Sequence, residues 1–438
     1  MLELILVAFF VAGYFLISVE ARTGINKGPI ALVMSGLMWT LLILLSSNID
    51  LPAPHAHSDA AAFVLDKLME HVGQVSGILF FLVGAMSIVE VVDHYHGFQI
   101  ITNAIRTQKL NSFMWISSAV TFMLSAVLDN LTTTIVMLSL LKNLVDSRQQ
   151  RWLLASVIVI AANAGGAWSP IGDVTTTMLW IGGQITPLAI ILKLIVPSII
   201  CMVIPLALVS LRRNRRLKMR RGRSAAHTQG PSKKEQKIML ITGVSGLVFV
   251  PVFKSVTHLP PFIGILISMS VLWIVTEILR KTRPFDDSTY TFENGLRRID
   301  LPSVFFFLGI LLAIGALETA GTLDSVAHFL QKTFSDKYVL NGLIGVLSAV
   351  VDNVPIVAAF QMMFDYPVDD VFWEGLAYAA GTGGSLLIIG SAAGVAAMGI
   401  EHITFGWYLR HIFGLALAGY LAGLLFYYLQ NQLIITLF

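Results

Sequence analysis

The segment that decides the fold is SAVLDNLTTTIVM at positions 125–137, where a carboxylate, an amide and three hydroxyls interrupt an otherwise apolar stretch. An ionised carboxylate costs roughly 2.5–3.5 kcal/mol at the centre of a bilayer, so Asp129 is expected to face water, a partner or a substrate. Oxygen ligands of these kinds suit hard cations. The motif therefore predicts a helix break with a cation site at Asp129, Asn130, Thr132 and Thr133, unless a neighbouring helix merely satisfies these groups.

The chain around this motif has the composition of a membrane protein. Of its 438 residues, 56% are hydrophobic and 13% are charged, whereas a soluble domain carries about 25% charged residues. A helix needs about 20 residues to cross the hydrocarbon core. Apolar runs of this kind occur at 1–19, 27–45, 72–92, 238–256, 259–279, 301–319 and 411–429. We therefore predict an all-α polytopic membrane protein whose main surroundings are the lipid bilayer.

The basic residues indicate how the spans are oriented, because Lys and Arg collect in cytoplasmic loops. They concentrate at 211–237, a polar stretch typical of a flexible cytoplasmic linker between two halves. Most of the other loop lysines and arginines fall on the same side if each half has about five spans and one re-entrant hairpin. Both termini are then periplasmic, and the odd number of spans inverts the second half relative to the first.

Internal repetition supports the division into halves. SAVLDN at 125–130 is echoed by SAVVDN at 348–353, and the glycines at 165, 166 and 172 are echoed at 383, 384 and 390. Inverted repeats build many secondary transporters, with the site where the halves meet. We predict a first inverted repeat at 1–210, with a hairpin near 112–145 and a discontinuous helix near 152–183, and a second at 238–438, with a hairpin near 338–364 and a discontinuous helix near 371–398.

A second motif, GGAWSPIGDVTTT at 165–177, also interrupts an apolar run. Irregular backbone at membrane depth survives only where it lines a cavity or is buried in protein, and its freed carbonyls and helix ends can coordinate a cation. Asn163, Asp173, Thr175 and Thr176 are the side chains it offers. The counterpart at 381–391 has serine at 391 where the first half has Asp173. The halves are thus similar in shape but unequal in charge, and close helix packing through small residues is the alternative.

Four further titratable residues lie near span ends. Glu90 and Glu318 occupy equivalent places and are either proton-handling groups or interfacial carboxylates. His94 and His96 follow Glu90, and histidine titrates near physiological pH, so they are candidate pH sensors or ordinary loop histidines. No His–Cys spacing indicates a zinc site.

On these motifs the chain resembles the ion transporter superfamily and, within it, the NhaD-type sodium/proton antiporters. The matching strings are SAVLDNLTTTIVM at 125–137, GGAWSPIGDVTTTMLWIGG at 165–183, SAVVDNVPIVAA at 348–359 and the Gly- and Ser-rich stretch at 381–394. Superfamily members that transport carboxylate substrates usually have Ser-Asn-Thr at the hairpin tip. Asp129 at that serine position favours a cation over an anion.

The resemblance implies a homodimer in a bacterial inner membrane that exports Na⁺ or Li⁺ in exchange for H⁺ and serves pH homeostasis. It implies Na⁺ at Asp129, Asn130 and Asp173. The wider set of cation- and proton-binding residues that it implies is Asp129, Asn130, Asn163, Asp173, Thr175, Thr176, Ser348, Asp352 and Asn353.

Two other functions are possible for such a sequence. An anion carrier of the same superfamily, for dicarboxylate, citrate or arsenite-like substrates, would need cationic or neutral hairpin tips, and no basic residue lies near either tip. An intramembrane aspartyl protease would need Gly-x-Gly before one aspartate, and Asp173 follows Pro-Ile-Gly. We therefore expect a secondary active antiporter, not an enzyme, that needs no cofactor and binds no nucleic acid.

Overall fold

The computed structural model describes residues 2–18, 20–46, 60–102, 105, 107, 109–212, 230–281 and 289–437. Every element in these ranges is an α-helix, and eight of the described helices are long and apolar enough to cross a membrane. The prediction of an all-α polytopic membrane protein is confirmed. Most of the predicted basic linker at 211–237 lies outside the described residues.

The chain forms two compact units, and each takes segments from both predicted halves. Unit 1 comprises Met1–Val83, Ile299–Ser335 and Val354–Asp365, and unit 2 comprises Gly84–Arg298, Asp336–Asn353 and Tyr366–Phe438. The helix α4 (Ala60–His94) runs from one unit into the other. The compact units therefore differ from the predicted repeats, and the inverted relation between the repeats stays a prediction.

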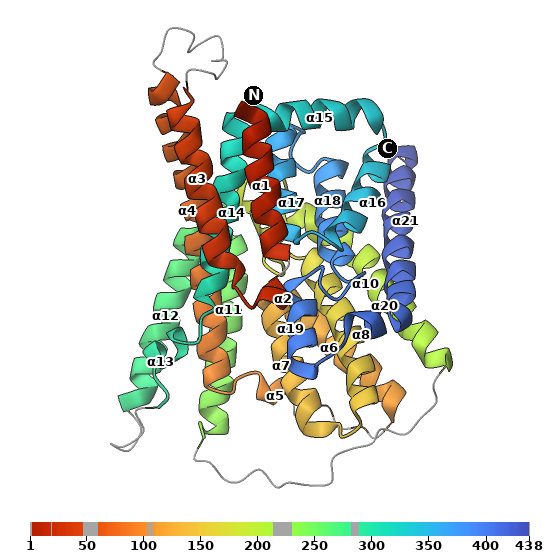
Figure 1. Ribbon diagram of the computed structural model, residues 1–438. Coiled ribbons are helices and arrows are strands. Elements are labelled where there is room, and N and C mark those ends of the chain that lie inside the picture. The colour runs from red at the N-terminus through yellow and green to blue at the C-terminus, as the bar shows by residue number, and fades with distance from the viewer. Residues whose placement is uncertain are drawn as a thin grey trace. The chain divides into compact units, whose positions relative to one another are not determined.

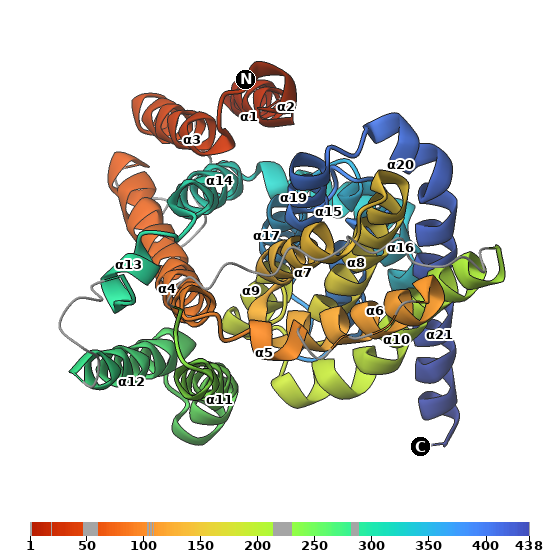
Figure 2. The same ribbon diagram turned by 90° about the horizontal axis from the view of Figure 1, so that it is seen from below.

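Unit 1 is built around the pair α3 and α14, which lie side by side in both views (Figures 1 and 2). The indole of Trp39 on α3 donates a hydrogen bond to the carbonyl of Leu312 on α14 at 2.9 Å. A Cβ at Gly309 would lie 2.5 Å from the carbonyl carbon of Ala31, so this close approach requires glycine. The helices of this unit besides α4 are α1 (Leu2–Ser18), α2 (Glu20–Thr23), α3 (Lys27–Leu44), α14 (Leu301–Thr319), α15 (Thr322–Thr333) and all but the first residue of α17 (Asn353–Met363).

Unit 2 is organised around α8, whose residues 153–167 are all buried. Apart from Asn163, its side chains there are apolar or small on every face, which is the pattern of a helix surrounded by protein. The helices α6, α7, α10, α18 and α19 pack against it. The helices of this unit are α5 (Gln99–Thr102), α6 (Leu110–Leu128), α7 (Asn130–Leu144), α8 (Arg148–Ala167), α9 (Val174–Ile181), α10 (Pro187–Arg212), α11 (Lys233–Thr257), α12 (Pro261–Lys281), α13 (Phe292–Leu296), α16 (Lys337–Ser348), α18 (Val371–Gly383), α19 (Ala392–Glu401), α20 (Phe405–His411) and α21 (Phe413–Leu437).

Helix breaks occur where the polar motifs interrupt the apolar runs. In the first half α6 gives way to α7 at Asp129, and α8 is separated from α9 by 168–173. In the second half α16 is separated from α17 by 349–352, and α18 from α19 by 384–391. That the two helix pairs are re-entrant hairpins stays a prediction. Within unit 2, α19 lies beside α7 and α8 (Figure 2), which brings breaks from both halves together.

Candidate cation site

The break between α6 and α7 is made by Asp129 itself. Its side chain caps α7, accepting hydrogen bonds from the backbone N–H of Thr132 at 2.9 Å and from the Thr132 hydroxyl at 2.9 Å. Its backbone has φ 82° and ψ 161°, a region that residues other than glycine rarely occupy. Such strain costs about 1–3 kcal/mol and gathers at functional sites. The backbone of Asp129 therefore supports a functional role for this residue.

Asp173 makes the second break of the first half in the same way. It is 3% exposed, and its Oδ1 caps α9 by accepting hydrogen bonds from the backbone N–H and the hydroxyl of Thr175, at 3.1 and 3.0 Å. Its Oδ2 accepts a hydrogen bond from the side-chain amide of Asn130 at 2.9 Å. Among the described residues Asp173 has no cationic partner, so its charge is open to an external cation.

Asn163 ties the breaks of the two halves together. Its side chain is fully buried, and its Oδ1 accepts a hydrogen bond from Asn130 Nδ2 at 3.1 Å. Its Nδ2 donates to the hydroxyls of Ser385 and Ser391, at 2.8 and 2.9 Å. Ser391 also caps α19 by accepting from Gly394 N–H. All hydrogen-bonding atoms of this amide are thus used, and its position depends on both halves of the chain.

Three threonine hydroxyls of the two motifs are buried without a hydrogen-bond partner among the described residues. The Oγ1 atoms of Thr133, Thr134 and Thr176 are buried and have no hydrogen-bond partner within the part of the chain that the structure describes. Buried polar atoms normally have partners, and a hydroxyl oxygen is a ligand for hard cations. These atoms are therefore candidate cation ligands, and Thr134 is not among the site residues predicted from the sequence.

The serines that begin the two DN motifs make matching contacts. Ser125 Oγ donates to the carbonyl of Ala162 at 2.6 Å, and Ser348 Oγ donates to the carbonyl of Ala380 at 2.9 Å. Ser348 Oγ also lies within hydrogen-bonding distance of Asn353 Oδ1. In both halves this serine therefore links the segment at the helix break to the neighbouring discontinuous helix by a hydrogen bond.

The second half offers fewer charges to the site. Asn353 is 5% exposed, whereas Asp352 is half-buried in the break before α17. Ser391 occupies the capping position that Asp173 fills in the first half. The sequence marks this serine as the counterpart of Asp173, but it is not among the predicted site residues. Its contact with Asn163 joins residues far apart in the chain, which no local pattern reveals.

Glu90, His94 and His96 form a separate polar group. Glu90 Oε2 lies 3.6 Å from Arg298 Nε, and His94 Nε2 is 2.8 Å from the carbonyl oxygen of Thr289. His96 Nδ1 is 3.1 Å from Gln99 Nε2. These contacts do not include the Asn130–Asn163–Asp173 network. The roles of the three residues in proton handling and pH sensing stay predictions.

Glu318, on α14 in unit 1, is not part of this group. Its Oε2 lies 3.7 Å from Nε2 of His71, which is 4% exposed and packs against Gly315. Glu318 therefore pairs with a buried histidine, and its predicted proton-handling role stays a prediction.

Replacing Ser391 with alanine is expected to lower the free energy of unfolding by more than the loss of a helix cap alone would. An N-cap contributes about 1 kcal/mol, and an Asn163 donor left unpaired in the interior costs about 1–3 kcal/mol more. Ser232→Ala is a matched control, because it removes the cap of α11 at an exposed position. Thermal unfolding in detergent should show a clearly larger drop for Ser391→Ala; equal drops would contradict the network.

Acidification is expected to weaken the folded state through His96. Burial lowers the pKa of His96 below its usual value, so the unfolded chain binds the extra proton first. The stability that the neutral ring contributes is therefore present above about pH 6.5 and is lost as the pH falls below it. His96→Asn, which suits the backbone φ of 57°, should lose less thermal stability between neutral and acidic pH than the wild type. His328→Asn, at an exposed position, is the control.

Helices that break at carboxylates within a polytopic bundle are typical of secondary transporters, and the relatives of this chain are transporters, not enzymes. Residues 2–373 match the family described as citrate transporter, CitMHS, and the chain belongs to this family. Sodium/proton antiporter 1 of Arabidopsis thaliana is 43% identical over 97% of this chain and 72% of its own length. Sodium/proton antiporter 2 of that plant is 41% identical, over 95% and 97%. The Na⁺/H⁺ antiporter NhaD of Vibrio cholerae is 27% identical, over 97% and 91%. The resemblance to NhaD-type antiporters is confirmed.

Proposed function

We propose that this protein is a sodium/proton antiporter in which one cluster of carboxylates at the helix breaks holds either a cation or protons. The observation that carries the proposal is the Asn130–Asn163–Asp173 network, in which the Asp173 carboxylate is buried without a cationic partner among the described residues. The names of the relatives support sodium and protons as the exchanged ions.

The exchange follows from competition for the same oxygens. A buried carboxylate is stable when protonated or when a cation lies beside it, and it is costly when charged and alone. Loading with Na⁺ therefore expels protons, and protonation expels Na⁺. The empty charged site crosses the membrane poorly, so only the two loaded forms change their access. Inward movement of protons then drives Na⁺ or Li⁺ outward.

The ligands that we assign to Na⁺ come from both breaks of the first half. They are carboxylate oxygens of Asp129 and Asp173 and the side-chain oxygen of Asn130, with hydroxyls of Thr132, Thr133, Thr175 and Thr176 nearby in the chain. We assign only a proton to Asp352 of the second half. The break beside it offers fewer side-chain oxygens as cation ligands than the breaks of the first half.

An anion substrate fits the same cluster poorly. A helix N-terminus attracts anions, but the N-termini of α7, α9 and α19 are already capped by Asp129, Asp173 and Ser391. A citrate or another dicarboxylate would meet two carboxylates. Export of a cation is therefore the better-supported function within the citrate-transporter family.

Several finer properties belong to the same proposal. We infer a homodimer in a bacterial inner membrane, with the 211–237 segment cytoplasmic and both termini periplasmic, that serves pH homeostasis. The support is the distribution of basic residues and the resemblance to NhaD-type antiporters. The molar mass of the purified protein in detergent tests the dimer.

The test of the function is ion exchange in inside-out vesicles that are energised to an acidic interior and contain a pH-sensitive dye. Addition of Na⁺ or Li⁺ should restore the dye fluorescence, whereas K⁺ serves as the comparison cation. If no cation restores fluorescence while the folded protein takes up citrate, the antiporter proposal is wrong and the anion carrier is favoured.

A further inference from the structure

A second deeply buried carboxylate lies in unit 2 outside all the motifs. Glu374, in the first turn of α18, is 1% exposed. Farther along the same helix, a Cβ at Gly381 would lie 3.7 Å from Asp173 Oδ2. At a rise of 1.5 Å per residue, Glu374 is about 10 Å along α18 from this contact. It is therefore near the cation site but distinct from it.

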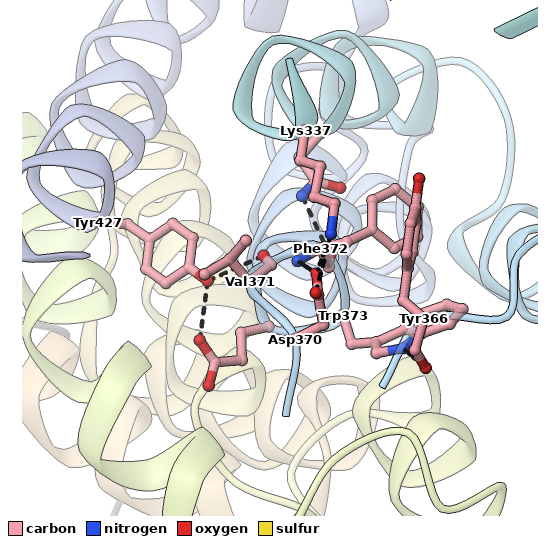
Figure 3. Close-up of polar contacts among 9 residues, drawn as sticks. Lys337, Tyr366, Asp370, Val371, Phe372, Trp373 and Tyr427 are labelled. Carbon is pink, nitrogen blue, oxygen red and sulfur yellow. Dashed lines mark hydrogen bonds and ion pairs between the residues drawn. The ribbon is translucent and has the colours of Figure 1, made fainter. Parts of the chain in front are cut away.

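The hydrogen bonds of Glu374 fit a carboxylic acid. The hydroxyl oxygen of Tyr427 lies 2.9 Å from Glu374 Oε2. It also lies 2.9 Å from the carbonyl oxygen of Val371 (Figure 3). A phenol has a single hydrogen to donate. If Glu374 were ionised, one of the two acceptor oxygens would face the lone pairs of Tyr427. A protonated Glu374 removes this conflict, because it donates to Tyr427 while Tyr427 donates to Val371.

The charged side chains around Glu374 are engaged with other groups. Lys337 pairs with Asp370 at 2.8 Å in the same close-up (Figure 3), and Lys193 donates to Asn431 Oδ1 at 3.0 Å. The ionisable groups that act on Glu374 from its surroundings are Lys193 of α10, Tyr338 of α16, Tyr427 of α21 and the pair Asp369 and Asp370 before α18. No ion pair within 4.0 Å joins Glu374 to a cation among the described residues.

Two influences on Glu374 oppose each other. A helix N-terminus favours a negative charge in its first turn, whereas burial and the geometry of Tyr427 favour the neutral acid. The amide nitrogen of Asn431, one turn along α21 from Tyr427, is buried and has no hydrogen-bond partner in the described part of the chain. The same side chain acts on the phenols of Tyr427 and Tyr338, and its N–H can also donate to water or to an ionised carboxylate. The surroundings can therefore support both protonation states.

We propose that Glu374 binds and releases a proton during the transport cycle, at a position on α18 separate from the sodium-binding carboxylates. This inference rests on the proposed antiport function. Glu374 passes its proton to water and takes one from water, with no other bond changed.

The test uses the purified full-length protein and two readouts. The first is the infrared carbonyl band of a protonated carboxylic acid, measured across pH with and without Na⁺. The second is the exchange rate and its pH profile in proteoliposomes. Glu374→Gln keeps a donor toward Tyr427 but cannot titrate. Glu277→Gln, which neutralises a partly exposed glutamate paired with Arg280 on α12, is the matched control.

We expect an acid band that is lost in Glu374→Gln, remains in Glu277→Gln, and shrinks when Na⁺ binds. The exchange rate of Glu374→Gln should fall at least roughly tenfold, because side chains that transfer protons contribute about 10²–10⁴ to rates. Its pH profile should change, and the pH dependence of its half-saturating Na⁺ concentration should weaken, because coupling between Na⁺ binding and the Glu374 proton is reciprocal. Tyr427→Phe should move the pH at which the acid band appears, which keeps the test valid if Glu374→Gln does not fold.

Three outcomes in an active wild type would overturn the role of Glu374 alone. The first is a wild-type spectrum with no band assignable to Glu374 at any pH. The second is a Glu374 band whose intensity is the same with and without Na⁺. The third is an unchanged rate and pH profile in Glu374→Gln beside an active wild type, which would reject only the role of Glu374. A wild type without exchange would reject the antiport function, and the role of Glu374 with it.

Discussion

Replacing Asp173 with asparagine is expected to reduce sodium-driven proton movement to background while the protein still folds. The substitution removes the negative charge that binds Na⁺ and the proton that is exchanged for it. It also places an NH₂ group opposite either Asn130 Nδ2 or the donors of Thr175, because Asp173 accepts on both of its oxygens. Dye fluorescence in inside-out vesicles measures the loss.

Asp146→Asn is the matched control for this experiment, because it neutralises an exposed aspartate between α7 and α8. It should leave exchange close to the wild-type rate. Wild-type exchange in Asp173→Asn would contradict the assignment of this carboxylate. A protein lost from the membrane would instead show that the residue is needed for folding.

Replacing Gly383 with alanine is expected to destabilise the protein strongly. The new Cβ would lie 2.1 Å from the carbonyl oxygen of Gly345 on α16, and backbone atoms cannot move aside as a flexible side chain can. Overpacking of this kind costs about 1–3 kcal/mol, occasionally more. We expect roughly 3 kcal/mol, seen as a large drop in the thermal unfolding midpoint in detergent.

Gly399→Ala separates this steric effect from the general preference of helices for alanine. A Cβ at Gly399, inside α19, would meet nothing within 4 Å. Alanine gains up to about 1 kcal/mol over glycine in a helix, so this variant should be as stable as the wild type or more stable. Equal destabilisation of the two variants would show that α16 and α18 are farther apart at Gly345 and Gly383 than in the structure.

The sequence predicted those parts of the structure that depend on local chemistry. Long apolar runs require helices in a bilayer, because only regular hydrogen bonding satisfies the backbone there. The breaks at Asp129 and Asp173 follow from side chains that cap the next helix, a signal contained within a few residues. The breaks, and with them the candidate carboxylates, could therefore be located from the sequence, whereas the caps were found in the structure.

Contacts between distant segments could not be predicted in this way. Asn163 meets Ser385 and Ser391 only because α8, α18 and α19 pack together, and neither serine carries a charge that would mark it. Glu374 was missed for another reason, since an acidic residue in the first turn of a helix is ordinary. Only its burial and the position of Tyr427 distinguish it. The division into two compact units likewise depends on packing that crosses the predicted repeats.

The contact made by Asn163 has a consequence for how the halves of the chain depend on each other. When the glycine pairs at 165–166 and 383–384 are aligned, the second half has Gly381 where the first has Asn163, and Ala167 stands where the second has Ser385. Two copies of the first half would therefore set this amide against an alanine and a second aspartate, and two copies of the second half would have glycine in its place. The repeated halves have become complementary parts, so neither can replace the other, and a working protein needs one of each.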